Sequence, residues 1–120
     1  MSSRLTVAAG LDAVRAAREA SGACHARMLR HGTLAVEFYA PVETDHPLPH
    51  PRDAAFVIAA GSATSVCGGE PHPVEPGEVV FVAAGTAHHF EEASGDFAAW
   101  VLFYGPVGGE GPDAEIPPHR

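Results

Sequence analysis

Two histidines stand just ahead of an apolar run in this sequence. In the stretch HPLPHPRDAAFVIAAG, His46 and His50 precede a run that closes on Gly61. Neutral imidazoles bind divalent transition metals, and a nearby carboxylate offsets the charge of the ion. The spacing is similar to half of such a metal site, except that Ala54 stands where the carboxylate would be needed. Whether a metal can bind there depends on the elements that position these side chains.

The sequence predicts a short amphipathic helix over residues 10–22. Leu11 and Val14 fall on one stripe of that helix, and charged residues fall on another. Gly22 ends the pattern, and glycine suits the C-terminal cap of a helix because it adopts a left-handed conformation without steric cost. The helix therefore precedes the segments that carry His46 and His50.

From residue 25 onward the pattern alternates with a period of two, which is typical of strands. The segment LAVEFYA shows it clearly, with Leu34, Val36 and Phe38 on one side. Turns rich in glycine, proline and serine separate the expected strands, which are 34–40, 54–60, 63–67, 70–74, 79–83, 87–92 and 97–104. Short strands at such regular intervals predict an antiparallel sandwich or barrel.

One domain is expected for a chain of 120 residues, which can bury a real core but is too short for two domains. The predicted organisation is an N-terminal helix within residues 1–22, a strand-rich body over residues 23–105 and a flexible acidic tail over residues 106–120. The tail prediction rests on glycine, proline and acidic residues that show no periodicity.

The formal net charge is -8, and five of the seven basic residues fall within the first 30 positions, so the body is strongly acidic. An acidic surface repels phosphate backbones and anionic lipids, so we expect no nucleic acid and no membrane as partners. No apolar run approaches the ~20 residues that span a bilayer, and residues 1–22 lack the pattern of a signal peptide. We therefore expect a cytoplasmic protein in which Cys24 and Cys67 are thiols rather than a disulfide.

The segment PGEVVFVAAGTAHHFEE resembles the second conserved motif of the cupin superfamily. That motif has a glycine, five residues, Pro-x-Gly, two residues, a histidine, three residues and an asparagine. Gly77, Gly85 and His88 match it. Ala83 replaces the proline, and Glu92 stands at the asparagine position.

The opening stretch is similar to the first cupin motif, which has His-x-His, three or four residues, a glutamate, six residues and a glycine. With Gly61 as the closing glycine, Ala54 takes the glutamate position and His50 that of the second histidine. Leu48 takes the position of the first histidine. The similarity extends over roughly residues 28–109, and there the chain looks like the small single-domain bacterial cupins with a conserved barrel.

The resemblance implies an all-β fold, a single antiparallel β-barrel of the jelly-roll or double-stranded β-helix type, preceded by the short helix. In this architecture metal ligands point into the barrel from neighbouring strand pairs, so His50 and His88 would converge in an otherwise apolar cavity. The residues expected to line that cavity are Ala54, Phe56, Ile58, Phe81, Phe90 and Trp100. Trp100 could instead pack in the core or in a contact between subunits.

A metal in this barrel would be held by His50, His88 and, as the best candidate for a third ligand, His46. His46 lies in a proline-bounded loop whose extended backbone could bring it inward, although loop histidines are usually solvated. His89 should face the opposite side of its strand from His88. The ion could be zinc, nickel, iron or manganese (Zn, Ni, Fe or Mn), held more weakly because the glutamate is replaced by Ala54.

Three functions are compatible with this sequence. The first is a metal-dependent cupin that acts on a small molecule, with no reaction assigned. The second is a metal-free pocket for a small apolar ligand, in which the histidines form hydrogen bonds. The third is a structural cupin that forms a homodimer through its sheets.

Overall fold

The part of the chain that the structure describes folds into one helix followed by eight strands. The structure is a computed structural model that describes residues 2–41 and 49–111. In chain order the elements are α1 (Val7–Ser21), β1 (His25–His31), β2 (Leu34–Tyr39), β3 (Asp53–Ala60), β4 (Ala63–Cys67), β5 (Glu70–Val74), β6 (Val79–Val82), β7 (His88–Glu91) and β8 (Ala98–Tyr104). Each strand expected from the sequence is present, and β1 adds a strand where the period of two begins.

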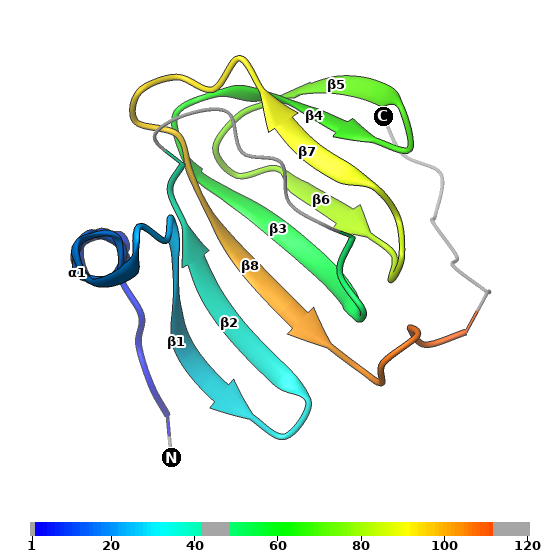
Figure 1. The fold of residues 1–120 in the computed structure, drawn as a ribbon, viewed down its shortest axis with the longest axis horizontal. Coiled ribbons are helices and arrows are strands. Elements are labelled where there is room, and N and C mark those ends of the chain that lie inside the picture. The colour runs from blue at the N-terminus through cyan, green and yellow to red at the C-terminus, as the bar shows by residue number, and fades with distance from the viewer. Residues whose placement is uncertain (1, 42–48, 112–120) are drawn as a thin grey trace.

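The described strands form two antiparallel sheets. The larger sheet has the order β1-β2-β8-β3-β6, and the smaller has the order β5-β4-β7. Figure 1 shows the smaller sheet above the larger one, with β7 near β6, and α1 beside β1. The predicted all-β antiparallel fold with an N-terminal helix is therefore confirmed, although no hydrogen-bonded ladder joins the two described sheets into a closed barrel.

Helix α1 begins at Val7, earlier than the sequence pattern predicted, because Thr6 caps it. The Thr6 side chain accepts a hydrogen bond from the backbone N–H of Ala9 at 3.1 Å. At the other end Gly22 adopts the predicted left-handed conformation, with a φ of 76°, and its N–H donates to the carbonyl oxygen of Arg18. Within the described residues, no helix is both long and apolar enough to cross a membrane.

Apolar side chains are buried on both faces of the larger sheet. Between the two sheets, Phe56 and Ile58 of β3 pack with residues of both sheets, including Phe90 of β7. On the outer face, Phe38 of β2 forms a cluster with Val14 of α1 and Ala98, and Trp100 of β8 packs against this cluster, its ring edge to face with that of Phe38 at 4.7 Å. The face of β2 and β8 that points away from the barrel interior is therefore apolar on the side of the helix.

The carboxylate of Asp53 joins three segments at the start of β3. It is 5% exposed, and its two oxygens accept hydrogen bonds from the backbone N–H groups of Ala84 and Glu110, each at 2.9 Å. The N–H of Gly108 also donates to the carbonyl oxygen of Pro51 at 2.7 Å. Residues 106–111, the described part of the predicted tail, are thus hydrogen-bonded to the barrel, and residues 112–120 lie outside the described residues.

Candidate functional site

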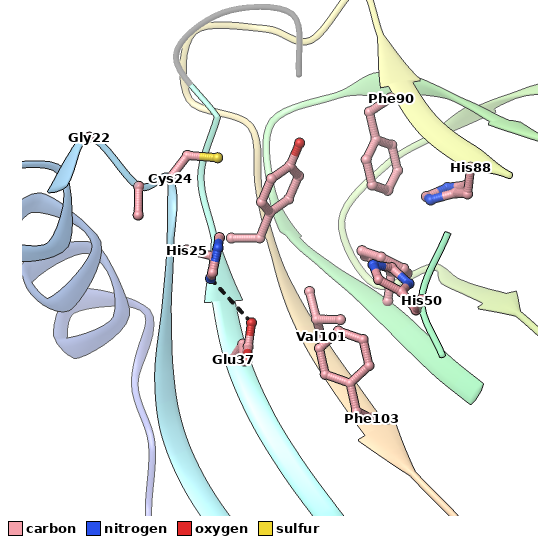
Figure 2. A pocket seen from close by; sticks show the side chains of 12 residues that line it. Gly22, Cys24, His25, Glu37, His50, His88, Phe90, Val101 and Phe103 are labelled. Carbon is pink, nitrogen blue, oxygen red and sulfur yellow. Dashed lines mark ion pairs between the residues drawn. The ribbon is translucent and has the colours of Figure 1, made fainter. Parts of the chain in front are cut away.

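A cavity of about 500 Å³ opens between the two sheets. Its walls are mostly apolar, with the rings of Phe56, Phe90 and Phe103 and the side chain of Val101. Polar side chains reach it from two sides. Figure 2 shows His25 and Glu37 on one side of the cavity and His50 and His88 on the other, with aromatic and aliphatic side chains between them.

His88 points into the barrel because β7 alternates between the two faces of its sheet. His88 and Phe90 are buried at 5% exposure each, whereas His89 between them is partly exposed. The imidazole Nε2 of His88 lies 3.1 Å from the hydroxyl oxygen of Ser65, a buried residue of β4. Burial lowers the pKa of His88 to about 4, with smaller contributions from His50 and His89, so its imidazole is neutral at neutral pH.

His50 is positioned by backbone and ring contacts just before β3. Its carbonyl oxygen accepts a hydrogen bond from the N–H of Gly85 at 2.8 Å, and this bond ties it to the turn that leads into β7. Its ring meets that of Phe103 edge to face at 4.9 Å and lies 5.9 Å from that of Phe56. Burial lowers the pKa of His50, and the negative charge of Glu37 opposes this effect.

The imidazole of His50 has an unused hydrogen-bonding atom. Its Nδ1 is buried and has no hydrogen-bond partner among the described residues. A buried polar atom without a partner costs free energy, so in native proteins such an atom usually meets water, a ligand or an ion. The two histidines therefore present polar atoms in neutral rings within an apolar cavity.

The described residues do not provide the ligands of a divalent metal site. Across residues 2–41 and 49–111, no three or more histidine, cysteine, aspartate or glutamate side chains come together as metal ligands could. Ala54 is fully buried in the apolar core where the motif would have its glutamate. The predicted third ligand, His46, lies outside the described residues.

The predicted lining residues are only partly brought together. Phe56 and Phe90 line the cavity, whereas Ala54 and Ile58 pack in the apolar core and are not among its lining residues. Phe81, expected to line the cavity, is 48% exposed.

Strand parity explains why two of the expected residues lie elsewhere. On β6, Val80 and Val82 take the inward positions, so Phe81 points outward. On β8, Trp100 has the opposite parity to Val101 and packs against the outer cluster that contains Phe38 instead. Trp100 therefore occupies the core position that the sequence left open as an alternative.

In the wall formed by the start of β1 and by β2, Cys24, His25 and Glu37 were not expected to be site residues. Cys24, His25, Glu37 and Tyr39 line the cavity there. The alternation of β2 put Phe38 and Glu37 on opposite sides of the strand without showing which side faces the interior, and Phe38 packs with the helix. The signal available in the sequence was the amphipathic helix itself, because its apolar stripe needs an apolar surface outside the barrel.

Comparisons with known proteins agree on the family of the barrel. A family model described as "Cupin domain" matches residues 35–104. "Uncharacterized protein SCO3923" of Streptomyces coelicolor is 35% identical over 98 residues, which cover 80% of this chain and 93% of that protein.

Two solved structures illustrate the likeness of the fold. A Cupin 2 conserved barrel domain protein from Salinispora arenicola has a TM-score of 0.61 and 18% identity, with coverage of 88% of this chain and 89% of its own. A predicted oxalate decarboxylase from Thermotoga maritima has a TM-score of 0.54 and 18% identity, with coverage of 67% and 77%.

Proposed function

The chain belongs to the cupin domain family, and we propose that it binds a small organic molecule in the cavity between its two sheets. The observation that carries this proposal is the cavity itself. Pockets for small ligands have volumes of roughly 300–1,000 Å³ and are mostly apolar, with a few polar groups that orient the ligand. The cavity of about 500 Å³, with polar side chains on two opposite sides, has these properties.

His50 and His88 would orient the ligand through hydrogen bonds. Both have lowered pKa values, so each ring has one donor and one acceptor nitrogen at neutral pH. The buried Nδ1 of His50 lacks a partner among the described residues, and a ligand hydroxyl, amide or amine could supply one. Phe56 and Phe103 would contact the apolar body of the same ligand.

A ligand screen followed by a pair of matched variants tests the proposal. Protein-detected NMR would screen small organic compounds for shifts at the lining residues. We expect His88→Gln to weaken binding of a hit about tenfold, or about 1.4 kcal/mol, because the amide cannot reproduce the geometry of the imidazole. The control is His89→Gln, which changes the same chemistry on the outward side of β7 and should leave affinity unchanged. Equal effects of the two variants would contradict the proposal.

Oxalate and other dianions are not the ligands that this cavity favours. The Thermotoga neighbour is described as a predicted oxalate decarboxylase, and oxalate carries two negative charges at neutral pH. The described residues that line the cavity include Glu37 but no lysine and no arginine. A dianion would therefore be repelled by the carboxylate without a cation to offset its charge.

A metal-dependent form of this function is the second candidate. The unpartnered Nδ1 of His50 and the neutral ring of His88 favour it, because metals bind neutral imidazole. Two imidazoles are fewer than the three protein ligands typical of catalytic zinc sites, so the described residues alone fit such an ion poorly. His46 would be the third ligand in this candidate, and zinc, nickel, iron or manganese would be the ion.

Metal analysis of protein purified without a histidine tag distinguishes the two forms. In the metal-dependent form we expect about one equivalent of metal per chain after supplementation. His50→Ala, His88→Ala and His46→Ala should each reduce that content, and His72→Ala, at an exposed position on β5, is the matched control. Sub-stoichiometric metal after supplementation would exclude the metal-dependent form and leave the ligand-binding proposal standing.

We also propose that two copies of the chain associate through β6. This strand ends the larger sheet, and Val79 and Phe81 on its outward face are 62% and 48% exposed. An exposed apolar edge strand can pair with a second chain. A two-fold axis beside β6 would pair each strand with its copy and bury both Phe81 rings.

A further inference from the structure

The side of the cavity opposite His50 and His88 holds a carboxylate that the proposed function does not use. Glu37 of β2 lines the cavity, and its side chain is only 17% exposed. Figure 2 shows Glu37 beside His25, across the cavity from His50 and His88. A carboxylate so placed costs free energy of desolvation unless donors or cations satisfy its oxygens.

The partners of Glu37 leave part of its hydrogen-bonding capacity unfilled. Its Oε1 lies 3.3 Å from Nδ1 of His25, and its Oε2 lies 4.0 Å from a guanidinium nitrogen of Arg27. A separation of 4.0 Å is too long for a hydrogen bond. An ionised carboxylate offers about four acceptor positions, so Oε2 retains positions for a further donor.

The charge of Glu37 is only partly offset by its neighbours. The Arg27 side chain is 55% exposed, and ion pairs of such exposed groups are weakened by solvent and salt. The His25 side chain is 58% exposed, so its interaction with Glu37 is weakened by solvent in the same way. The cavity therefore favours positive charge near Glu37.

Aromatic rings add to this preference. Tyr39 lies on the same strand as Glu37 with the same parity and also lines the cavity. The ring centroids of Tyr39 and Phe90 lie 6.1 Å apart. The faces of such rings attract cations, most strongly where water is excluded.

We propose that Glu37, oriented by His25, forms a subsite for a protonated amine, so that the ligand is a small organic cation with an aromatic or apolar body. The inference rests on the ligand-binding function proposed above and names its ligand class. The ammonium group donates to Oε2 of Glu37 near the ring of Tyr39. The apolar body lies along the phenyl side chains, and a polar group at its far end reaches His50.

Three probes of matched shape test the charge preference in the unmodified protein. Tryptamine, tryptophol and indole-3-propanoate share an indole ring on a short side chain that ends in an ammonium, a hydroxyl and a carboxylate. We expect tryptamine to bind about tenfold more tightly than tryptophol, which corresponds to about 1.4 kcal/mol, and indole-3-propanoate to bind least. NMR titration gives the three dissociation constants and shows which lining residues shift.

Glu37→Gln is the matched variant, because it keeps the shape and an acceptor oxygen for His25 but removes the charge. It should reduce the affinity of tryptamine to that of tryptophol and leave tryptophol unchanged. Glu91→Gln is the control, since Glu91 is exposed on β7 and pairs with His89 outside the cavity. It should alter none of the three constants.

The outcomes separate the ligand class from the function. If tryptophol or indole-3-propanoate binds as tightly as tryptamine, with shifts at the lining residues, the amine subsite is refuted and the ligand-binding function stands. A preference for tryptamine that persists in Glu37→Gln also refutes the subsite. If none of the probes shifts any lining residue at millimolar concentration, both the subsite and the binding of ligands of this size are refuted.

Discussion

Burial, rather than a charged partner, determines the state of His88. The imidazole lies against aromatic rings of β3 and β7 and its Nε2 meets the hydroxyl of Ser65, so the protonated form would lose hydration with little compensation. The ring is therefore a hydrogen-bonding group at neutral pH and becomes a cation only in acid. Its neutrality matters for an amine ligand, because a charged imidazole across the cavity would oppose the charge that Glu37 attracts.

Stability should fall between about pH 6.5 and about pH 4 because of His88. Its pKa is lowered from 6.5 to about 4 on folding, so in this range the unfolded chain binds a proton that the folded chain does not. The contribution of His88 to the free energy of unfolding is then fully present above pH 6.5. It is lost as the pH falls towards 4, and the loss is about 2–3 kcal/mol at most. Urea unfolding of metal-free protein at several pH values measures this loss of unfolding free energy.

His88→Gln removes the titrating group, so it should flatten this part of the stability profile. His72→Gln, at an exposed position on β5, is the control and should leave the slope unchanged. A slope that remains the same in His88→Gln would show that other groups cause the loss in acid.

The sequence predicted the polar wall that holds His50 and His88, but not the wall that holds Glu37. His50 and His88 stand at fixed distances from glycines that form turns, so the motif positions predicted both. Glu37 could not be found in this way, because the alternation of β2 has two sides that both become buried. Only the packing of Phe38 with the helix shows which side faces the cavity.

At the scale of elements, the start of β3 joins the segments that hold the site. Asp53 accepts hydrogen bonds from the turn before β7 and from the segment after β8, and the neighbouring His50 bonds to the same turn through Gly85. The hydrogen bonds from Ala84 and Glu110 lower the pKa of Asp53, because they stabilise its ionised form. No sequence pattern specifies the partners of Asp53, because they are backbone N–H groups.

Asp53→Asn should destabilise the fold and weaken ligand binding together. An amide has one acceptor oxygen, so either Ala84 or Glu110 loses its partner. We expect the thermal midpoint to fall by several degrees and the NMR signals of His50 and His88 to shift. Asp12→Asn, on the exposed surface of α1, is the control and should change neither.

The sign of the pH effect for Asp53 is the same as that for His88, but its range is lower. The stabilisation is present above the ordinary pKa of 3.8 and is lost as the pH falls through the lowered value. Asp53→Asn should therefore flatten the profile below pH 3.8 and leave the decline between 6.5 and 4 intact. An unchanged profile below pH 3.8 would mean that other carboxyl groups cause that loss.

At the scale of the whole molecule, regular turns and alternating strands predicted the all-β fold and its helix. Which strands form each of the two sheets was not predicted, because strand pairing between distant segments leaves no local pattern in the sequence. β8 pairs with both β2 and β3 in the middle of the larger sheet. The outward position of Phe81 follows from the register of β6 on β3, which a shift of one residue would reverse.

Association through β6 would explain why the apolar ring of Phe81 stands exposed at the end of a sheet. Each copy has a net charge of -8, so the two copies repel one another, and salt should strengthen the dimer by screening that repulsion. Sedimentation equilibrium should show tighter association in about 0.5 M than in about 0.05 M sodium chloride. Phe81→Glu places a carboxylate at the axis and should raise the dissociation constant at least about tenfold.

Val107→Glu is the matched control for the dimer, because Val107 is 78% exposed and lies outside β6. It adds the same charge without entering the proposed contact, so it should change the dissociation constant only through the general repulsion between copies. Equal weakening by the two variants would mean that charge, not the β6 edge, governs association. A monomer at both salt concentrations would refute the dimer and leave Phe81 as an exposed ring on an edge strand.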